Sequence, residues 1–270
     1  MAHREHGPDP SISLSWDPAI VPSLADAPDL VRSPGYLGAL ADNATEWAHA
    51  ISAGRFWRSV KAQLPIWTDE YCNRHGGTEL VDGPLSNFCA KSASSIQDKI
   101  RRATKPPLES SRSKPMEIFK DGSLVPSIND LVRCRVACTY LDGATFLADK
   151  LCDFIETEKG ERTKPSFQNR IEGYYAIHVY FHDDVILQYG QVRHPIQRIK
   201  VEIQIATVLA TQAWKATHAF YEMARGTGPD RALWSPETIT FIARQLGHMV
   251  HLADGLIVQL KNHVRAQDKD

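Results

Sequence analysis

The amino-acid sequence predicts an α/β protein, with a mixed sheet of about five strands flanked by helices and with helical additions at both ends. Two observations support this class. Strand-like apolar runs alternate with helix-like patterns through the middle of the chain, and amphipathic stretches with a helical period lie on either side. Apolar residues make up 43% and charged residues 23% of the 270 positions, which is ordinary for a globular protein large enough to bury a core.

The N-terminal part of the chain changes character near residue 36. The first 35 residues are rich in Pro, Asp and Ser, so we expect an irregular arm with a short helix at 23–32. Residues 36–74 have helical spacing. Their apolar stripe consists of Trp47, Ile51, Phe56, Trp57, Val60, Leu64 and Trp67. We interpret the tryptophans as core residues in preference to ligand contacts.

The middle of the chain carries both strand and helix signals. The expected elements are an extended piece at 88–91, a helix at 93–103, a loop-rich insertion at 104–128, a strand at 131–140, a helix at 144–158, and strands at 174–181, 185–189 and 199–205. The stretch from His182 to Asp184 is typical of a hairpin turn.

Two helices are expected at the C-terminal end, over residues 208–225 and 237–264. Ser235 is placed as the N-cap of the second helix and Pro236 as its first residue. The chain therefore divides into an arm at 1–35, a domain at 36–225 and a C-terminal helical extension at 226–270.

Net charge and cysteine usage exclude several classes of protein. The formal net charge of -1 argues against a generally basic nucleic-acid binder, although cations can still cluster locally. The five cysteines form no CxxC pair, so zinc-ribbon and thioredoxin-like folds have no support. Neither a secretory leader nor an apolar stretch long enough to span a bilayer is evident, so we expect a cytoplasmic, reduced protein with no membrane partner.

The stretch that begins at Lys91 combines features that bind polyphosphate. Ser92 is placed as the N-cap of the following helix, and Ser95, Lys99 and Arg102 lie on one face of that helix. Free N–H groups at a helix start, a hydroxyl and fixed cations can hold phosphate without a P-loop, and the sequence has no GxxxxGK[ST] motif. The alternative is an amphipathic helix with a solvated basic face.

Two carboxylates on separate strands form a candidate Mg²⁺ site. Asp130 leads into the first long strand, and Glu202 shares one face of an alternating strand with Gln204. Water and phosphate oxygens can complete the octahedron around an ion held by Asp130 and Glu202. Strand parity places Arg135 opposite Asp130, unless Asp130 lies in the turn before the strand. The alternative for each carboxylate alone is a solvated strand end.

A further polar face is predicted on the strand that follows Gly173. Tyr174 and His178 share this face, whereas Tyr175 points to the other side with the core residues. Tyr174 offers a platform on which a base can stack, and His178 can donate to a phosphate or a ribose. The alternative is a structural role for both side chains.

In this order, the four stretches resemble the synthetase domain of the RelA/SpoT family, the makers of (p)ppGpp alarmones. The motifs are KSxxSIxxK from Lys91, DxxxxR from Asp130, GYxxxH from Gly173 and VEIQIxT from Val201, with Trp214 and His218 in the next helix. They extend over residues 88–221, about half of the chain. The resemblance implies a nucleotidyltransferase-like synthetase fold and a pyrophosphokinase, that is, a diphosphotransferase that uses ATP and Mg²⁺.

The resemblance also implies roles for individual residues. These are Lys91, Ser95, Lys99 and Arg135 for the ATP phosphates, Asp130 and Glu202 for Mg²⁺, Tyr174 for stacking on the acceptor base, and His178 and Gln204 for positioning the acceptor. Glu202 would also help to activate the attacking 3′-hydroxyl. The reaction would be in-line attack on the β-phosphorus of ATP, in which positioning and charge neutralisation supply most of the rate.

The chain departs from the family pattern at several positions. Cys89 stands where the family usually has an arginine, Arg133 where it has the glycine of DxxG, and Ala206 where it has the arginine of EIQIRT. No companion hydrolase domain is indicated, so the resemblance is to the synthetase-only small alarmone synthetases. The GYYA sequence at 173–176 and the lost basic residues resemble their toxic branch, which occurs in toxin–antitoxin and phage-defence pairs.

Losing basic contacts suits an acceptor that has no 5′-polyphosphate. We therefore expect a toxin that stops growth by pyrophosphorylating the 3′ CCA end of tRNA, with an antitoxin protein as partner. The cations expected to meet the tRNA backbone are Arg55, Arg58, Lys61, Arg101, Arg102, Lys105, Arg112, Lys114 and Lys120. An ordinary solvated surface is an equal alternative for these cations.

Two other functions stay open at this point. One is a (p)ppGpp or (p)ppApp alarmone synthetase that acts on GDP, GTP or adenine nucleotides. The other is a catalytically inactive sensor that binds a nucleotide or RNA. On the C-terminal helix, His248, His251 and Asp254 are spaced three residues apart, and we interpret them as a solvated polar face in preference to a metal site.

Overall fold

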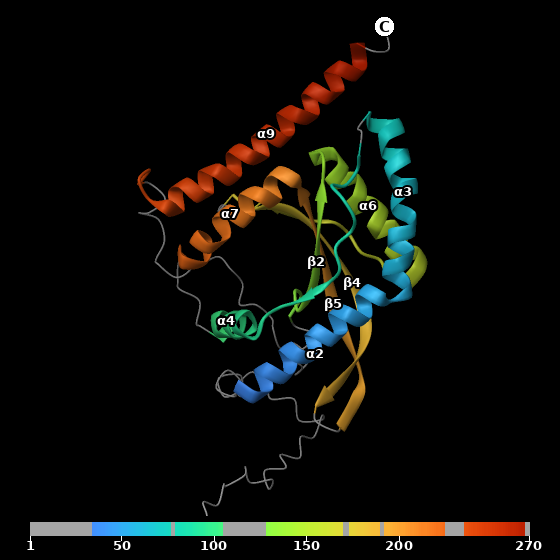
Figure 1. Cartoon of the computed structure of the whole chain (residues 1–270), viewed down its shortest axis with the longest axis vertical. Coiled ribbons are helices and arrows are strands. Elements are labelled where there is room, and N and C mark those ends of the chain that lie inside the picture. The colour runs from blue at the N-terminus through green and yellow to red at the C-terminus, as the bar shows by residue number, and fades with distance from the viewer. Residues whose placement is uncertain are drawn as a thin grey trace, which may run out of the picture.

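The computed structural model describes residues 34–76, 79–104, 128–169, 173–189, 192–224 and 235–267. Its centre is a mixed five-stranded sheet with the order β1-β2-β5-β4-β3, flanked by helices (Figure 1), which confirms the predicted α/β class. The strands are β1 (Cys89–Ala90), β2 (Val132–Cys138), β3 (Ser166–Asn169), β4 (Tyr175–Tyr189) and β5 (Val192–Thr207). The helix predicted at 23–32 and almost all of the insertion predicted at 104–128 lie outside the described residues.

The longest pairing in the sheet is the antiparallel hairpin of β4 and β5, and β2 joins β5 in parallel. The prediction of a hairpin turn at His182–Asp184 is wrong, because His182 pairs with Lys200 inside the ladder. Contacts with Glu161 override the turn-like sequence: one carboxylate oxygen accepts the His182 backbone N–H at 3.0 Å, and the other lies 2.5 Å from His182 Nδ1. The strand predicted at 185–189 is therefore the continuation of β4.

The edge strand β3 is an element that the sequence pattern does not predict. It is four residues long and pairs with β4 in antiparallel register, from Ser166 opposite His178 to Asn169 opposite Tyr175. Its sequence, Ser-Phe-Gln-Asn, contains a single apolar residue, and that residue, Phe167, is exposed. A strand this short and polar carries no alternation signal, so only its pairing with β4 defines it.

One face of the sheet is the apolar core, covered by three helices: α2 (Pro34–Ala53), α3 (Arg55–His75) and α6 (Leu141–Lys159). The helical stretch predicted at 36–74 is thus two helices, which meet at Gly54. Trp47, Trp57 and Trp67 are all buried, which confirms their expected core role. Trp57 is fully buried against Phe88, at 4.7 Å between ring centroids, and a side chain of this kind contributes roughly 2–3 kcal/mol to stability.

Three further helices complete the described fold: α4 (Ala93–Thr104), α7 (Val208–Ala224) and α9 (Ile239–Gln267). The predicted start of α9 is wrong. Ser235 does not cap the helix, because the residues after it form a turn in which the Thr238 N–H donates to the Ser235 carbonyl at 3.0 Å. Thr238 is the N-cap instead, and its hydroxyl accepts the Phe241 N–H at 3.2 Å.

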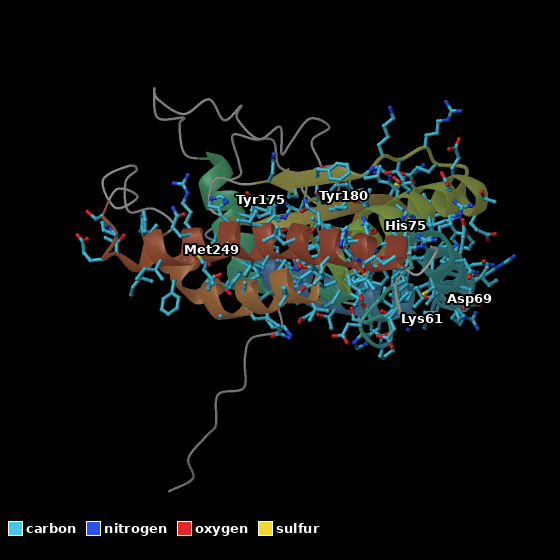
Figure 2. The ribbon with its side chains drawn as sticks, turned by 90° about the horizontal axis from the view of Figure 1, so that it is seen from above. Lys61, Asp69, His75, Tyr175, Tyr180 and Met249 are labelled. Atoms are coloured by element: carbon cyan, nitrogen blue, oxygen red, sulfur yellow. The ribbon has the colours of Figure 1, made fainter. Side chains whose placement is uncertain are left out.

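Helix α9 crosses the top of the molecule and packs on α7 (Figures 1 and 2). Tyr175 donates to or accepts from His248 Nδ1 at 2.8 Å and stacks on His251 at 3.8 Å between ring centroids. Asp254 is buried and accepts the Thr207 hydroxyl at 2.5 Å. The interpretation of these helix residues as a solvated polar face is therefore wrong, and Tyr175 packs against α9 where a core position was expected.

Within the described part of the chain, no helix is both long enough and apolar enough to cross a membrane.

The tightest contact of α9 joins two glycines. Gly173 has a φ of 78°, and a Cβ atom added at Gly247 would lie 2.9 Å from the Gly173 Cα and still closer to its carbonyl oxygen. The helix can therefore approach the start of β4 only because neither residue has a side chain.

We predict that Gly247→Ala lowers the free energy of unfolding by about 1–3 kcal/mol, because the methyl group forces the helix away from Gly173. Gly255→Ala is the matched control on the same helix, since a Cβ there meets no atom within 4 Å. The control should raise stability by about 1 kcal/mol through helix propensity. Urea unfolding of the two variants measures both effects, and equal stability would contradict the close packing.

Candidate functional site

The second face of the sheet carries polar side chains in cross-strand rows. The burial of β2 alternates, with Arg133 and Arg135 on the half-exposed face. The register places Arg135 beside Gln204 of β5, and Gln204 beside His178 of β4. A second row contains Arg133, Glu202 and Tyr180. Because directly paired residues point to the same side of a sheet, residues from distant segments converge here.

Hydrogen bonds link most of these side chains into one network. Arg135 Nη2 donates to Gln204 Oε1 at 3.3 Å, and Gln204 Nε2 donates to Glu202 Oε1 at 2.5 Å. The other Glu202 oxygen lies 3.5 Å from His178 Nδ1. Glu202, Gln204 and His178 are all buried, so their positions are fixed by these contacts as well as by the strands.

Tyr174 lies at the end of this network, directly after the left-handed Gly173. Its hydroxyl is 3.1 Å from His178 Nε2, and its ring packs on Trp214 of α7 at 4.6 Å between centroids. Nδ1 of the same histidine is 3.2 Å from the Tyr180 hydroxyl. The imidazole of His178 is thus held between two tyrosines, and the ring of Tyr174 is oriented by Trp214.

Asp130 forms the second part of the site, with two lysines. It lies in the turn before β2, which removes the parity difficulty with Arg135. Lys91 Nζ is 2.7 Å from Asp130 Oδ2, and Lys99 Nζ is 2.5 Å from Oδ1. Burial opposes ionisation of Asp130, but the two ammonium groups outweigh burial, and the pKa of the carboxyl lies well below its usual value. Burial lowers the pKa of Lys91, and Asp130 opposes that shift.

The start of α4 adds hydrogen-bonding groups beside these lysines. Ser92 is the N-cap, as predicted, because its hydroxyl accepts the Ser95 N–H at 3.3 Å. The same hydroxyl donates to the Ser95 hydroxyl at 3.0 Å. The Lys91 N–H donates to the Leu131 carbonyl at 2.8 Å, so the chain before α4 is tied to the chain before β2. This contact brings Lys91 to Asp130 across 39 residues of sequence.

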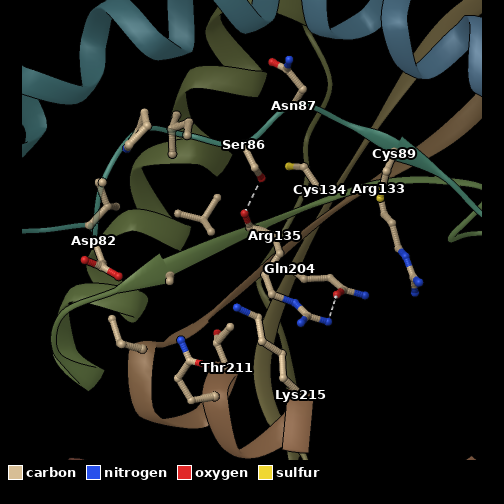
Figure 3. A pocket seen from close by; sticks show the side chains of 18 residues that line it. Asp82, Ser86, Asn87, Cys89, Arg133, Cys134, Arg135, Gln204, Thr211 and Lys215 are labelled. Carbon is tan, nitrogen blue, oxygen red and sulfur yellow. Dashed lines mark hydrogen bonds between the residues drawn. The ribbon is translucent and has the colours of Figure 1, made fainter. Parts of the chain in front are cut away.

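A cavity of about 560 Å³ lies beside Arg133 and Arg135 (Figure 3). Its volume is within the usual range for a small-molecule site. The cavity is lined by the segment 81–87, by Cys89, by residues 133–137 of β2, and by Gln204, Val208, Thr211, Gln212 and Lys215. Neither the segment 81–87 nor Lys215 belongs to a motif, so the sequence pattern did not point to either. Lys215 had one indirect signal, because it follows Trp214 in a helix already connected with the site.

The two carboxylates expected to bind Mg²⁺ come from neighbouring segments of the sheet, the turn before β2 and the strand β5. Asp130 precedes β2 by two residues, and the β2 residue Arg133 pairs with Glu202. In the described part of the chain, no three His, Cys, Asp or Glu side chains form a metal-binding group. Asp130 and Glu202 supply hard oxygen donors, and Mg²⁺ commonly binds through one or two carboxylates with substrate phosphates and water. The donor set therefore fits Mg²⁺ held jointly with a nucleotide.

The structure brings most of the candidate residues into two adjoining groups. Lys91, Lys99 and Asp130 form one group, with Ser95 at the start of the same helix. Arg135, Gln204, Glu202, His178 and Tyr174 form the other. Lys200 is influenced by both groups: burial lowers its pKa, Glu202 and Glu161 oppose that shift, and Lys99 adds to it.

The cations expected to contact tRNA are only partly described. The side chains of Arg55, Arg58 and Lys61 are exposed on α3, and the other six lie outside the described side chains. Lys61 Nζ donates to Asn87 Oδ1 at 3.1 Å, and Asn87 lines the cavity beside Arg135. Of these three cations, Lys61 therefore lies at the edge of the cavity.

Comparison with solved structures identifies the fold. Small alarmone synthetase 1 from Bacillus subtilis, bound to its product pppGpp, matches with a TM-score of 0.50 at 16% identity, over 77% of this chain and 91% of that chain. A GTP pyrophosphokinase family protein from Streptococcus pneumoniae matches with a TM-score of 0.50 at 15% identity, over 84% of this chain and 93% of that chain. No protein-family model and no curated protein matches the chain. The fold is that of the small alarmone synthetases.

We predict that Asp130→Asn lowers the free energy of unfolding by about 3 kcal/mol at neutral pH, because two largely buried ammonium groups lose their partner. Since the pKa of Asp130 is depressed, its contribution is complete above the unfolded value of about 4 and is lost as the pH falls below it. The stability difference between wild type and variant should thus stay constant from about pH 5 to 8 and shrink in acid.

Urea unfolding across this pH range tests the prediction. Asp149→Asn, at an exposed carboxylate on α6, is the matched control and should change stability by less than about 0.5 kcal/mol. A D130N penalty no larger than that of D149N would contradict the ion-pair cluster.

Proposed function

We propose that this protein is a Mg²⁺-dependent pyrophosphokinase that transfers the β,γ-diphosphate of ATP to a ribose 3′-hydroxyl. The observation that carries the proposal is the Asp130 group, in which two largely buried lysines hold a carboxylate directly before β2, the strand that pairs with the Glu202 strand β5. Lysines bind phosphate oxygens, and paired carboxylates bind the ion that accompanies a nucleotide. The fold shared with small alarmone synthetases supports the same chemistry.

In this proposal the lysines exchange partners when ATP binds. Lys91 and Lys99 release the Asp130 oxygens and bind the phosphates, which frees the carboxylate of Asp130. Asp130 and Glu202 would hold the ion, which supplies neutralisation of phosphate charge when it is bound. Arg135 and the cavity beside it accept the rest of the donor nucleotide.

The proposed transfer is a single in-line displacement. The acceptor 3′-oxygen forms a bond to the β-phosphorus, the bond from that phosphorus to the α,β-bridging oxygen breaks, and AMP leaves. The hydroxyl proton passes to Glu202, which Gln204 and His178 hold in place. Tyr174 stacks on the acceptor base, and its contact with Trp214 orients the ring.

For the acceptor, we propose the 3′ end of tRNA, and with it a growth-stopping toxin controlled by an antitoxin. The departure at Ala206 supports this choice, because the family usually has the arginine of EIQIRT at that position. An acceptor with a 5′-polyphosphate would need such cations. The second candidate is a guanine nucleotide, because two of the solved structures that share this fold are a synthetase bound to pppGpp and a GTP pyrophosphokinase family protein.

The experiment uses ATP labelled at the γ-phosphate, purified protein and Mg²⁺, with tRNA, GDP, GTP and ADP in separate reactions. We expect label on tRNA. Label on a guanine or adenine nucleotide would instead make the protein an alarmone synthetase. No transfer to any of the four, in wild type and in Asp130→Ala alike, would contradict the proposed enzyme and favour a nucleotide-binding sensor.

We predict that Glu202→Gln lowers the turnover number by about 10²–10⁴-fold, because the amide can neither accept the hydroxyl proton nor neutralise the ion. Glu161→Gln is the matched control: Glu161 is also partly buried beside the sheet, but it holds His182 and not the site. Steady-state kinetics on both variants decide the point. A loss of turnover that is equal in E202Q and E161Q would remove Glu202 from the chemistry.

We predict that Arg133 takes over the contact of the arginine that the family usually has at position 89. Cys89 and Arg133 are directly paired across β1 and β2, and both line the cavity, so a guanidinium from either position extends over the same wall. Arg133→Gly should raise the KM for ATP about 10-fold to 100-fold, the value of one charged hydrogen bond. The double variant C89R/R133G should recover most of the lost ATP affinity. A KM for ATP in the double variant that is no lower than in R133G would contradict the idea that Arg133 replaces an arginine at position 89.

A further inference from the structure

Helix α9 directs its charged side chains at the body of the protein. They are Arg244, Asp254, Lys261 and Arg265. Lys261 Nζ is 2.7 Å from Asp142 Oδ2 and Arg265 Nη2 donates to the Asn73 carbonyl at 2.9 Å. Asp254 is buried, and so is the Nε atom of Arg244. A helix that lies on a protein surface ordinarily has the reverse arrangement, with its charges in water.

The outward face of α9 is apolar over the length of the helix. Its exposed side chains are Ile239, Ile242, Leu246, Met249, Leu252, Leu256, Ile257, Leu260 and Val264, with exposed fractions from 39% to 66%. No other described element lies over this face in Figure 1, and in Figure 2 the helix with Met249 is nearest to the viewer. Within the described chain this face therefore has no cover.

The spacing along this face is that of a coiled-coil seam. The alternation of three- and four-residue steps runs through Ile239, Ile242, Leu246, Met249, Ala253, Leu256 and Leu260. This is the a and d pattern of the heptad repeat, sustained for three heptads. The side chains that flank the seam are Ala, Val, Ile, Leu or Gln, and none is charged. Such a seam is built to receive another helix.

The exposed area is sufficient for a stable interface. Nine large apolar side chains, each about half exposed, present on the order of 800 Å² of surface, which is what one partner buries in a standard protein interface. Monomeric proteins rarely expose an apolar patch of that size.

We propose that a second copy of this chain covers the seam, with the two α9 helices antiparallel about a two-fold axis near residue 251. This axis places Ile242 opposite Leu260, Leu246 opposite Leu256, and Met249 opposite Ala253 of the other copy. Every pair joins an a position with a d position, as antiparallel coiled coils require, and the large Met249 meets the small Ala253. The seam is thus complementary to itself.

The distribution of charge also fits a second copy. Like charges at flanking positions would repel in a symmetric pair, and α9 has none there. A partner that is selected by its charge would find no opposite charge on this face. The proposal is independent of the proposed function, because no seam residue belongs to the site.

Light scattering coupled to size-exclusion chromatography tests the proposal at micromolar protein concentrations. Wild type is expected at twice the 30.2 kDa of one chain. Leu246→Lys and Leu256→Glu should each give monomers, because each buries an unpaired charge twice in the dimer. The double variant L246K/L256E should return to the dimer, since each ammonium then faces a carboxylate of the other copy. The I242E/L260K set repeats the test at another layer.

Ile66→Glu is the matched control, because Ile66 is 58% exposed on α3 and outside the seam. It should leave the dimer intact. Circular dichroism establishes that the single variants are folded, as expected for substitutions at exposed positions. Wild type that stays at 30.2 kDa at all concentrations overturns the proposal, as do single variants that remain dimeric. A double variant that stays monomeric overturns the antiparallel register.

Discussion

The arrangement of the site depends on the parallel pairing of β2 with β5. This pairing sets Arg133 beside Glu202 and Arg135 beside Gln204, and the hairpin with β4 then adds His178 to the same row. A slip of one residue would turn every one of these side chains into the apolar core, where a charged group is costly. The buried residues between them, which pack under α2, α3 and α6, make that slip unfavourable, so the core fixes the register and the register fixes the site.

The charges of Asp130, Lys91 and Lys99 give the site its second property. Three largely buried ionised groups are stable together because each ammonium has a carboxylate oxygen within 2.7 Å, but together they leave an excess of one positive charge. That excess attracts an anion, and a polyphosphate with its cation can satisfy all three groups at once. The ion pairs therefore keep the two lysines in position when no ligand is bound, and the lysines can exchange the carboxylate for a phosphate.

The sequence pattern predicted those parts of the molecule whose structure is determined by short-range interactions. The alternation of β5, the N-cap at Ser92 and the order of helices and strands follow from short-range physics. The misplaced turn at His182 shows the limit, because Glu161 holds that residue in the ladder from outside the segment. The same applies to α9, because no helical period reveals that Asp254 contacts Thr207 or that His248 and His251 contact Tyr175. For the site, sequence alone suggested the residue types, whereas the cavity and its Lys215 depend on a long-range arrangement.

The most direct test of the account is the identity of the nucleotide left over from ATP. The groups around Asp130 and Glu202 are proposed to direct a ribose hydroxyl to the β-phosphorus, so AMP should appear in equal amount to a product with a 3′-diphosphate. Chromatography of the complete reaction measures both species. It is run with each acceptor that the wild-type protein uses, and again with the Glu202→Gln variant. Equal release of AMP and diphosphate product, lost in the variant, is the predicted result. Release of ADP or of free phosphate in their place would mean attack at the γ-phosphorus and would contradict the account.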